Sequence, residues 1–140
     1  MFVDASAVIA ILTAEPDAES LAMALDRHRR PVPIISVIAV WEAAAGLYRK
    51  KRIPIDVAEL RIEEFLDAAG VKVVAVSEED RKLALRAFDR YGRHRYSDRE
   101  RNKALNLADC FHYAVAKANR VPILTKDEGF SLTDLAIVKA

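Results

Sequence analysis

Four acidic residues of this 140-residue chain stand in or beside apolar segments, where a charge needs a specific reason. Asp4 interrupts the first apolar run, and Glu42 is a lone acid in an alanine-rich segment. Asp109 and Asp127 lie toward the end of the chain. Carboxylates that come together repel one another unless a cation is present, and a donor set of oxygens alone favours a hard ion such as Mg²⁺ or Mn²⁺. These four residues are therefore candidate metal ligands and candidate catalytic residues.

Each of these acids also has a purely structural explanation. Asp4, or Ser6 beside it, can cap the helix that follows, and Glu42 can face solvent from an amphipathic helix. Asp109 can favour the positive end of a helix dipole, and Asp127 can occupy an ordinary turn. Only their joint placement in the fold separates these explanations from a shared site.

The apolar pattern alternates between short strand-like runs and longer helical runs, which predicts an α/β fold. Residues 1–140 are expected to form one domain with a central parallel sheet of four or five strands and helices on both faces. The predicted strands are Met1–Asp4, Val32–Ser36, Val71–Val76 and Pro122–Thr125, with Ile137–Val138 as a short extra edge. Because Val71–Val76 is apolar apart from Lys72, it is predicted to be covered on both faces.

Helices are predicted between these strands. They start at Ser6 and after Pro16, and continue with Val37–Lys50, Asp56–Ala69, Ser77–Tyr91 and Asn106–Asn119. Gly70 is expected to end one of these helices, and Ser77 is expected to cap the next one. The polar segment from Arg93 to Lys103 has no apolar pattern and is predicted to be a loop.

The topology predicts where the four acids meet. In a parallel sheet, the carboxyl ends of the strands and the N-termini of the helices share one edge, where ligands bind. Asp4 and Asp127 follow strands, whereas Glu42 and Asp109 lie early in helices, so all four are expected at that edge. Carboxylates that hold a divalent metal support attack of water on a phosphodiester and stabilise the leaving oxygen. The sequence therefore predicts metal-dependent phosphodiester hydrolysis.

Basic residues are concentrated in one part of the chain. The net charge is only +1, from 22 basic and 21 acidic residues, but the stretch from Arg81 to Lys103 holds nine basic residues against three acids. This excess fits either a solvated helix face or a surface that holds a nucleic-acid backbone. The candidate contacts to a nucleic acid are Arg93, Arg95, Arg99, Arg101 and Lys103.

Several classes of protein are excluded by composition. The uncharged stretches are shorter than the roughly 20 residues that cross a bilayer, so no membrane span is expected. Cys110 is the only cysteine, which rules out an internal disulfide and favours a reducing cytoplasm. Neither a phosphate-binding glycine loop nor a dinucleotide fingerprint is present.

Other reactive or aromatic side chains are given ordinary roles. His112 lies one helical turn after Asp109, a spacing that would let it contribute to the same pocket, but it is expected to be partly exposed. An acyl-transfer site built on Ser6 and His112 lacks a nucleophile elbow. The remaining large aromatic side chains are predicted to be core residues, namely Trp41, Phe65, Phe88 and Phe111.

Specific motifs stand at the four acids. They are Val3-Asp4-Ala5-Ser6-Ala7-Val8, Glu42, Ala104-Leu105-Asn106-Leu107-Ala108-Asp109-Cys110-Phe111, and Pro122-Ile123-Leu124-Thr125-Lys126-Asp127. In order and spacing the chain resembles the PIN-domain ribonucleases, and within them the VapC-type toxins of toxin–antitoxin pairs, along nearly its whole length. Ala108 stands where many relatives carry Gly, and the segment Tyr91–Lys103 is longer than usual.

The resemblance implies an activity, a site and partners. Asp4, Glu42, Asp109 and Asp127 match the acidic metal site of the family, with Asp4 and Asp109 as direct ligands, while Ser6 and Thr125 orient carboxylates or water. The implied activity is Mg²⁺-dependent endonucleolytic cleavage of RNA. The implied partners are a cognate VapB-type antitoxin, whose helix would lie in a groove between the early helices, and a second copy of the chain in a homodimer.

Two other functions remain open at this point. A phosphoacceptor receiver domain is also a small α/β unit with an acidic edge, but it carries an adjacent acidic pair after its first strand, which this chain lacks. A catalytically idle module that only binds a partner would carry the same fold and show no activity dependent on metal.

Overall fold

The computed structural model describes residues 1–140 and contains a four-stranded parallel sheet. The strands are β1 (Phe2–Val3), β2 (Ile34–Ser36), β3 (Lys72–Val74) and β4 (Ile123–Leu124), in the order β3-β2-β1-β4. Phe2 pairs with Ile34 on one side and with Ile123 on the other, so β1 lies inside the sheet. The predicted α/β fold with a central parallel sheet is confirmed.

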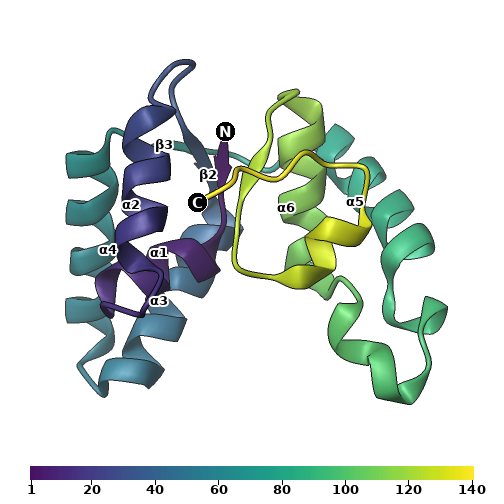
Figure 1. Ribbon diagram of the computed structural model, residues 1–140, viewed down its shortest axis with the longest axis horizontal. Helices are drawn as coiled ribbons and strands as arrows, with labels where there is room; N and C mark the ends of the chain where they lie inside the picture. The colour runs from purple at the N-terminus through teal and green to yellow at the C-terminus, as the bar shows by residue number, and fades with distance from the viewer.

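Six α-helices connect the strands. They are α1 (Ala5–Leu12), α2 (Ala18–Arg27), α3 (Val37–Lys51), α4 (Ile55–Ala69), α5 (Glu78–Tyr91) and α6 (Leu107–Ala118). The connections from β1 to β2 and from β2 to β3 run in the same direction across the sheet. The connection from β3 to β4 runs in the opposite direction, past β2 and β1. Because such crossovers are right-handed, α1 to α4 lie on one side and α5 with α6 on the other, as Figure 1 shows.

Local sequence signals account for the helix ends. The hydroxyl of Ser77 accepts a hydrogen bond from the N–H of Asp80, which returns one to the N–H of Ser77, so Ser77 caps α5 as predicted. Gly70 ends α4 with φ at 68°, a left-handed conformation that suits glycine. None of the helices is long and apolar enough to span a bilayer.

The core is built from the sheet and the inner faces of the helices. Phe2, Ile35, Leu124 and Phe130 are among its largest fully buried side chains. Its burial of apolar surface is the main source of folding free energy, and it fixes β1 and β4 side by side at the centre. The carboxyl ends of these strands carry Asp4 and the segment that leads to Asp127.

Two sequence predictions about burial are wrong. The segment Val71–Val76 is not covered on both faces, because β3 is an edge strand in which Val73 is 45% exposed. Trp41 and Phe88 are not core residues, since they are 71% and 51% exposed. The expected short edge at Ile137–Val138 is present as a single parallel bridge, between Ile123 and Ile137.

The basic segment is also more regular than a loop. It folds into two short 3₁₀ helices, η1 (Arg93–Arg95) and η2 (Asp98–Lys103), which Figure 1 shows below α5 and α6. A third, η3 (Glu128–Leu132), follows β4. In η2 each acid lies three residues before a base, and these pairs favour the turn conformation over an irregular chain.

Candidate active site

Asp4 is the centre of a hydrogen-bonded cluster at the carboxyl end of β1. Its backbone N–H donates to the carbonyl of Leu124 at 3.0 Å, which fixes it against β4. Its side chain is buried and makes no capping bond to α1. Instead, Oδ2 accepts from the hydroxyls of Ser6 and Thr125, the latter at 2.7 Å. The capping explanation therefore does not account for Asp4.

Ser6 and Thr125 are held so that their protons point at Asp4. The Ser6 hydroxyl accepts from the N–H of Lys126 at 3.0 Å, and the Thr125 hydroxyl accepts from the N–H of Asp127 at 3.0 Å. A hydroxyl that accepts from the backbone donates its own proton elsewhere, here to Oδ2 of Asp4. Oδ1 of Asp4 is left facing the opposite side, toward α3 and α6.

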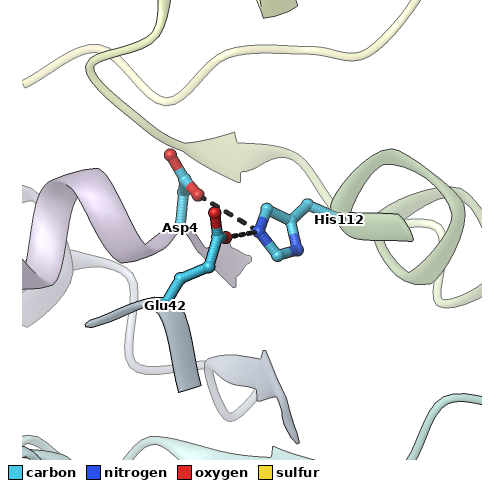
Figure 2. A group of neighbouring side chains, drawn as sticks. All are labelled: Asp4, Glu42 and His112. Atoms are coloured by element: carbon cyan, nitrogen blue, oxygen red, sulfur yellow. Dashed lines mark hydrogen bonds and ion pairs between the residues drawn. The ribbon is translucent and has the colours of Figure 1, made fainter. Parts of the chain in front are cut away.

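Glu42 and His112 complete this cluster, as Figure 2 shows. The Ser36 hydroxyl accepts from the N–H of Ala39 at 3.1 Å and so starts α3 directly after β2, which brings Glu42 over the sheet edge. Oε1 of Glu42 accepts a hydrogen bond from Nε2 of His112. The same Nε2 is 3.7 Å from Oδ1 of Asp4. One ligand atom from each of these three side chains falls within 4.8 Å of the others.

Asp109 lies at the start of α6 and has a structural role. Its Oδ2 accepts from the N–H of Asn106 at 2.9 Å, and its own N–H donates to Oδ1 of Asn106 at 2.9 Å. This reciprocal cap uses one carboxylate oxygen and leaves Oδ1 without a partner in the protein. Asp109 therefore does cap α6, as the structural explanation holds, but only one of its two carboxylate oxygens is used for this.

Asp127 is arranged in a similar way at the start of η3. Its Oδ1 accepts from the N–H of Gly129 at 2.7 Å, and Oδ2 has no partner. A Cβ on Gly129 would lie 2.9 Å from the carbonyl oxygen of Lys103 and 3.0 Å from Oδ1 of Asp127, so only glycine fits there without displacement. The turn that presents Asp127 is therefore packed directly against the end of η2.

The pKa values show that these carboxylates act on one another. Burial raises the pKa of Asp109 to about 7 against the lowering effect of the Asn106 N–H, and the charges of Asp127 and Asp4 raise it further. Burial also raises the pKa of Asp127 above its ordinary value, again with a contribution from Asp4. Asp109 and Asp127 lie outside the tight group of Asp4, Glu42 and His112, yet the charge of Asp4 contributes to the raised pKa of both.

His112 is the residue whose burial the sequence interpretation got wrong. It is fully buried rather than partly exposed, and its ring packs 5.4 Å from that of Phe2. Burial alone would lower its pKa, but the hydrogen bond that it donates to Glu42 and the charge of Asp4 raise the pKa above its ordinary value. The signal was its spacing of one helical turn from Asp109, which places both side chains toward the same part of the fold.

The contacts of His112 favour a positioning role over metal ligation. A histidine that ligates a metal normally has a hydrogen bond at its second ring nitrogen. Nδ1 of His112 is buried and has no partner. Because a carboxylate only accepts, Nε2 carries the proton that bonds to Glu42, and the ring holds Glu42 in place.

The donor set fits a hard divalent cation. Oδ1 of Asp4, Oδ1 of Asp109 and Oδ2 of Asp127 accept no hydrogen bond within the protein, and Glu42 lies beside Asp4. Burial is the main cause of the raised pKa values of Asp109 and Asp127, and the charge of Asp4 adds a repulsion that a cation would remove. Oxygen ligands of this kind suit Mg²⁺ or Mn²⁺ better than a soft metal.

Four of the five predicted RNA contacts are exposed and Lys103 is half-buried, and three of the five are paired with neighbouring acids. Arg95 contacts Asp89 at 3.3 Å, Arg101 contacts Asp98 at 2.6 Å, and Lys103 contacts Glu100 at 2.9 Å. Arg93 and Arg99 make no ion pair. Exposed pairs of this kind contribute little to stability, so these cations remain available to a polyanion.

Comparison with known proteins places the chain in a family. The family model for the PIN domain matches residues 1–135, and the chain belongs to the PIN-domain family. It is 38% identical over 138 residues to a ribonuclease VapC of Mycolicibacterium smegmatis, covering 99% of each chain. It is 32% identical over 138 residues to ribonuclease VapC30 of Mycobacterium tuberculosis, covering 99% of this chain and 98% of the relative. This is a VapC-type PIN domain, and a receiver domain is excluded.

Solved structures of other toxins share the fold. The crystal structure of VapC20 of Mycobacterium tuberculosis, described as a toxin that cleaves the sarcin-ricin loop, superposes with a TM-score of 0.71 at 18% identity, covering 99% of this chain and 98% of that one. A chain of a toxin–antitoxin complex from Klebsiella pneumoniae gives a TM-score of 0.66 at 19% identity, covering 95% and 92%. At these identities the likeness concerns the fold.

Proposed function

We propose that this chain is a Mg²⁺-dependent endoribonuclease and the toxin of a VapBC-type toxin–antitoxin pair. The observation that carries the proposal is the convergence of Asp4 and Glu42, from β1 and α3, in one cluster within 4.8 Å that also includes His112. Membership of a family whose full-length relatives are named ribonucleases supports RNA as the substrate.

The residues have distinct tasks in this proposal. Asp4 and Asp109 hold the metal directly, and Glu42 and Asp127 complete its carboxylate environment. A divalent metal bound there supplies the Lewis acidity that polarises a phosphodiester and makes water a nucleophile near neutral pH. Ser6 and Thr125 fix Oδ2 of Asp4 so that Oδ1 faces the site, and His112 holds Glu42.

The partners follow from the same family. A VapB-type antitoxin is expected to neutralise the enzyme, and the chain is expected to form a homodimer, which light scattering would detect. A cytoplasmic location suits an RNA substrate and the free thiol of Cys110. The basic residues Arg93, Arg95, Arg99, Arg101 and Lys103 are assigned to the RNA backbone.

The test is direct. The purified protein is incubated with total cellular RNA, with Mg²⁺ or with a chelator, and new RNA ends are mapped. Discrete cuts that require Mg²⁺ and disappear in Asp109→Asn support the proposal. Asp67→Asn is the matched control, because Asp67 is an exposed acid on α4, far along the chain from the site. A protein that binds its antitoxin but cuts no RNA with any divalent metal is an idle binding module, and the proposal is then wrong.

A further inference from the structure

A pocket of about 690 Å³ lies between α5 and α6, next to the carboxylate cluster but with no carboxylate in its lining. Leu85 and Phe88 of α5 form one wall, and Leu107 and Phe111 of α6 form the other. Cys110 closes the floor. Its volume lies within the roughly 300 to 1,000 Å³ that small-molecule sites occupy.

The walls of this pocket are apolar side chains that the fold leaves in contact with solvent. Leu85 is 60% exposed, Phe88 is 51% exposed and Leu107 is 78% exposed. Large apolar side chains gathered at one exposed place mark a binding surface more often than isolated ones do. The packing of α5 does not depend on Leu85 and Phe88, because Ala84 and Ala87 supply its buried face.

The polar part of the lining is cationic. It consists of Arg81, Arg93 and Arg101 together with Asn106, and no carboxylate belongs to it. Arg93 makes no ion pair, and the exposed pairs of Arg81 with Glu78 and of Arg101 with Asp98 are weak enough to be exchanged for a phosphate. A guanidinium matches a phosphate with two parallel hydrogen bonds.

The pocket adjoins the carboxylate site through one residue. Asn106 lines the pocket and is also the reciprocal hydrogen-bond partner of Asp109. Leu107 and Cys110, on either side of Asp109 in α6, line it too. A chain whose phosphate lies at the carboxylates therefore passes the mouth of the pocket.

We propose that this pocket receives unpaired nucleobases of the RNA next to the cleaved phosphate, while its arginines hold the adjacent phosphates. The inference rests on the proposed function and extends it to the way the substrate is held. Flat apolar walls with a half-exposed Phe88 suit stacking of a base, and a cationic rim without acids suits the backbone. Single-stranded RNA offers both features along one chain.

Binding is tested without cleavage, in the presence of a chelator. A fluorescent short oligouridylate is titrated with the protein, and its anisotropy gives the dissociation constant. Phe88→Ala is expected to weaken binding roughly five- to hundredfold, the range for losing one stacked base, whereas Phe88→Tyr keeps the affinity. Leu107→Ala is a second variant that removes part of the wall from an exposed position at the start of α6 and leaves the core intact. Leu60→Ala is the control, since Leu60 is 53% exposed on α4.

A second probe separates bases from phosphates. An oligomer with the same ribose-phosphate backbone and no bases should bind the wild-type chain more weakly and be indifferent to Phe88→Ala. Arg93→Gln should weaken both probes and lower the slope of log affinity against log salt by about one, whereas Arg61→Gln on α4 should change neither.

Three results would overturn the proposal. Phe88→Ala and Leu107→Ala could bind the oligouridylate as tightly as the wild type, or they could weaken the base-free oligomer equally. They could instead convert a dimer to a monomer with RNA affinity unchanged, which would make the pocket a protein interface. If the wild-type chain cuts RNA while these variants bind normally, only the pocket assignment fails. If it cuts no RNA, the proposed function fails.

Discussion

The carboxyl edge of the sheet and the basic segment from Arg93 to Lys103 hold their charges in opposite ways. Asp4 is buried, its side chain fixed by two hydroxyls that are themselves fixed by backbone N–H groups. The cations of the basic segment lie at the surface, and three of them are paired with acids three or six residues away. Burial of the first set costs desolvation free energy and fixes the positions of the side chains. The second set stays in contact with water, so it costs little free energy and its side chains can move. Substitutions should therefore affect the chemical step at the first and substrate affinity at the second.

The largest effect is expected for Asp4→Asn. Loss of a ligand charge at the metal removes several kcal/mol of transition-state stabilisation, so kcat should fall roughly a thousandfold or more. The amide can still accept from Ser6 and Thr125, so the circular dichroism spectrum should be unchanged. Isothermal titration should show weakened Mg²⁺ binding. If the Asp4→Asn variant remains active and binds metal, the active site does not lie at this edge of the sheet.

A dependence of stability on pH is the next largest effect, and it also belongs to the buried edge. The folded, metal-free chain holds a proton on Asp109 up to a pKa of about 7, whereas the unfolded chain releases it near the ordinary value of 3.8. Stability therefore falls as pH rises through this interval. The raised pKa of His112 acts in the same direction, because the stability it adds at low pH is lost as that group deprotonates.

Urea unfolding in a chelator should measure this loss. Between about pH 5.5 and 8.5 we expect the free energy of unfolding to drop by about 2 kcal/mol, since a tenfold change in proton affinity corresponds to about 1.4 kcal/mol. The pKa of Glu15, lowered to about 2, lies outside this window. Asp109→Asn should flatten the profile, and saturating Mg²⁺ should restore stability at the alkaline end. A profile that rises with pH contradicts the assigned pKa directions.

The architecture and the candidate carboxylates were accessible from the sequence because both follow from the ends of apolar runs. Asp4 sits where β1 stops, and parallel topology then brings Glu42 to the same edge. The burial of His112 was not accessible, because it depends on α3 lying against α6, a contact between segments 70 residues apart. The exposure of Val73 depends on strand order in the same way, which a local apolar pattern does not report.

The pocket beside the basic segment could not be predicted from the sequence either, because it also depends on contacts between distant segments. Phe88 and Phe111 fit a core pattern, and nothing local distinguishes them from buried aromatics. The position of the pocket depends on η1 and η2, which fold the basic segment back beside α6. The sequence indicated an excess of positive charge there but could not show that an apolar surface lies next to it.

A smaller effect is expected for Thr125→Val, which keeps the shape of the side chain and removes its hydroxyl. Oδ2 of Asp4 then loses one donor and the N–H of Asp127 loses its acceptor. Changes of this kind beside metal ligands typically cost 10- to 100-fold in metal affinity or activity, and we expect about tenfold because Ser6 still donates to Asp4. Mn²⁺ titration measures the affinity for metal. Thr133→Val, directly after the end of η3, is the matched control. Equal metal affinity in the two variants would show that Thr125 does not orient Asp4.

The smallest effect is expected for Arg101→Gln in the basic segment. Its pair with Asp98 is exposed on both sides, so the free energy of unfolding should change by less than about 0.5 kcal/mol. RNA affinity should fall a few-fold, with the slope against salt reduced by about one, while kcat at saturating RNA stays constant. The double variant Arg101→Gln with Thr125→Val should then show the two losses separately, one in KM and one in metal affinity. If Arg101→Gln lowers kcat instead, the basic segment takes part in the chemical step, and the division between a buried catalytic edge and an exposed binding surface does not hold.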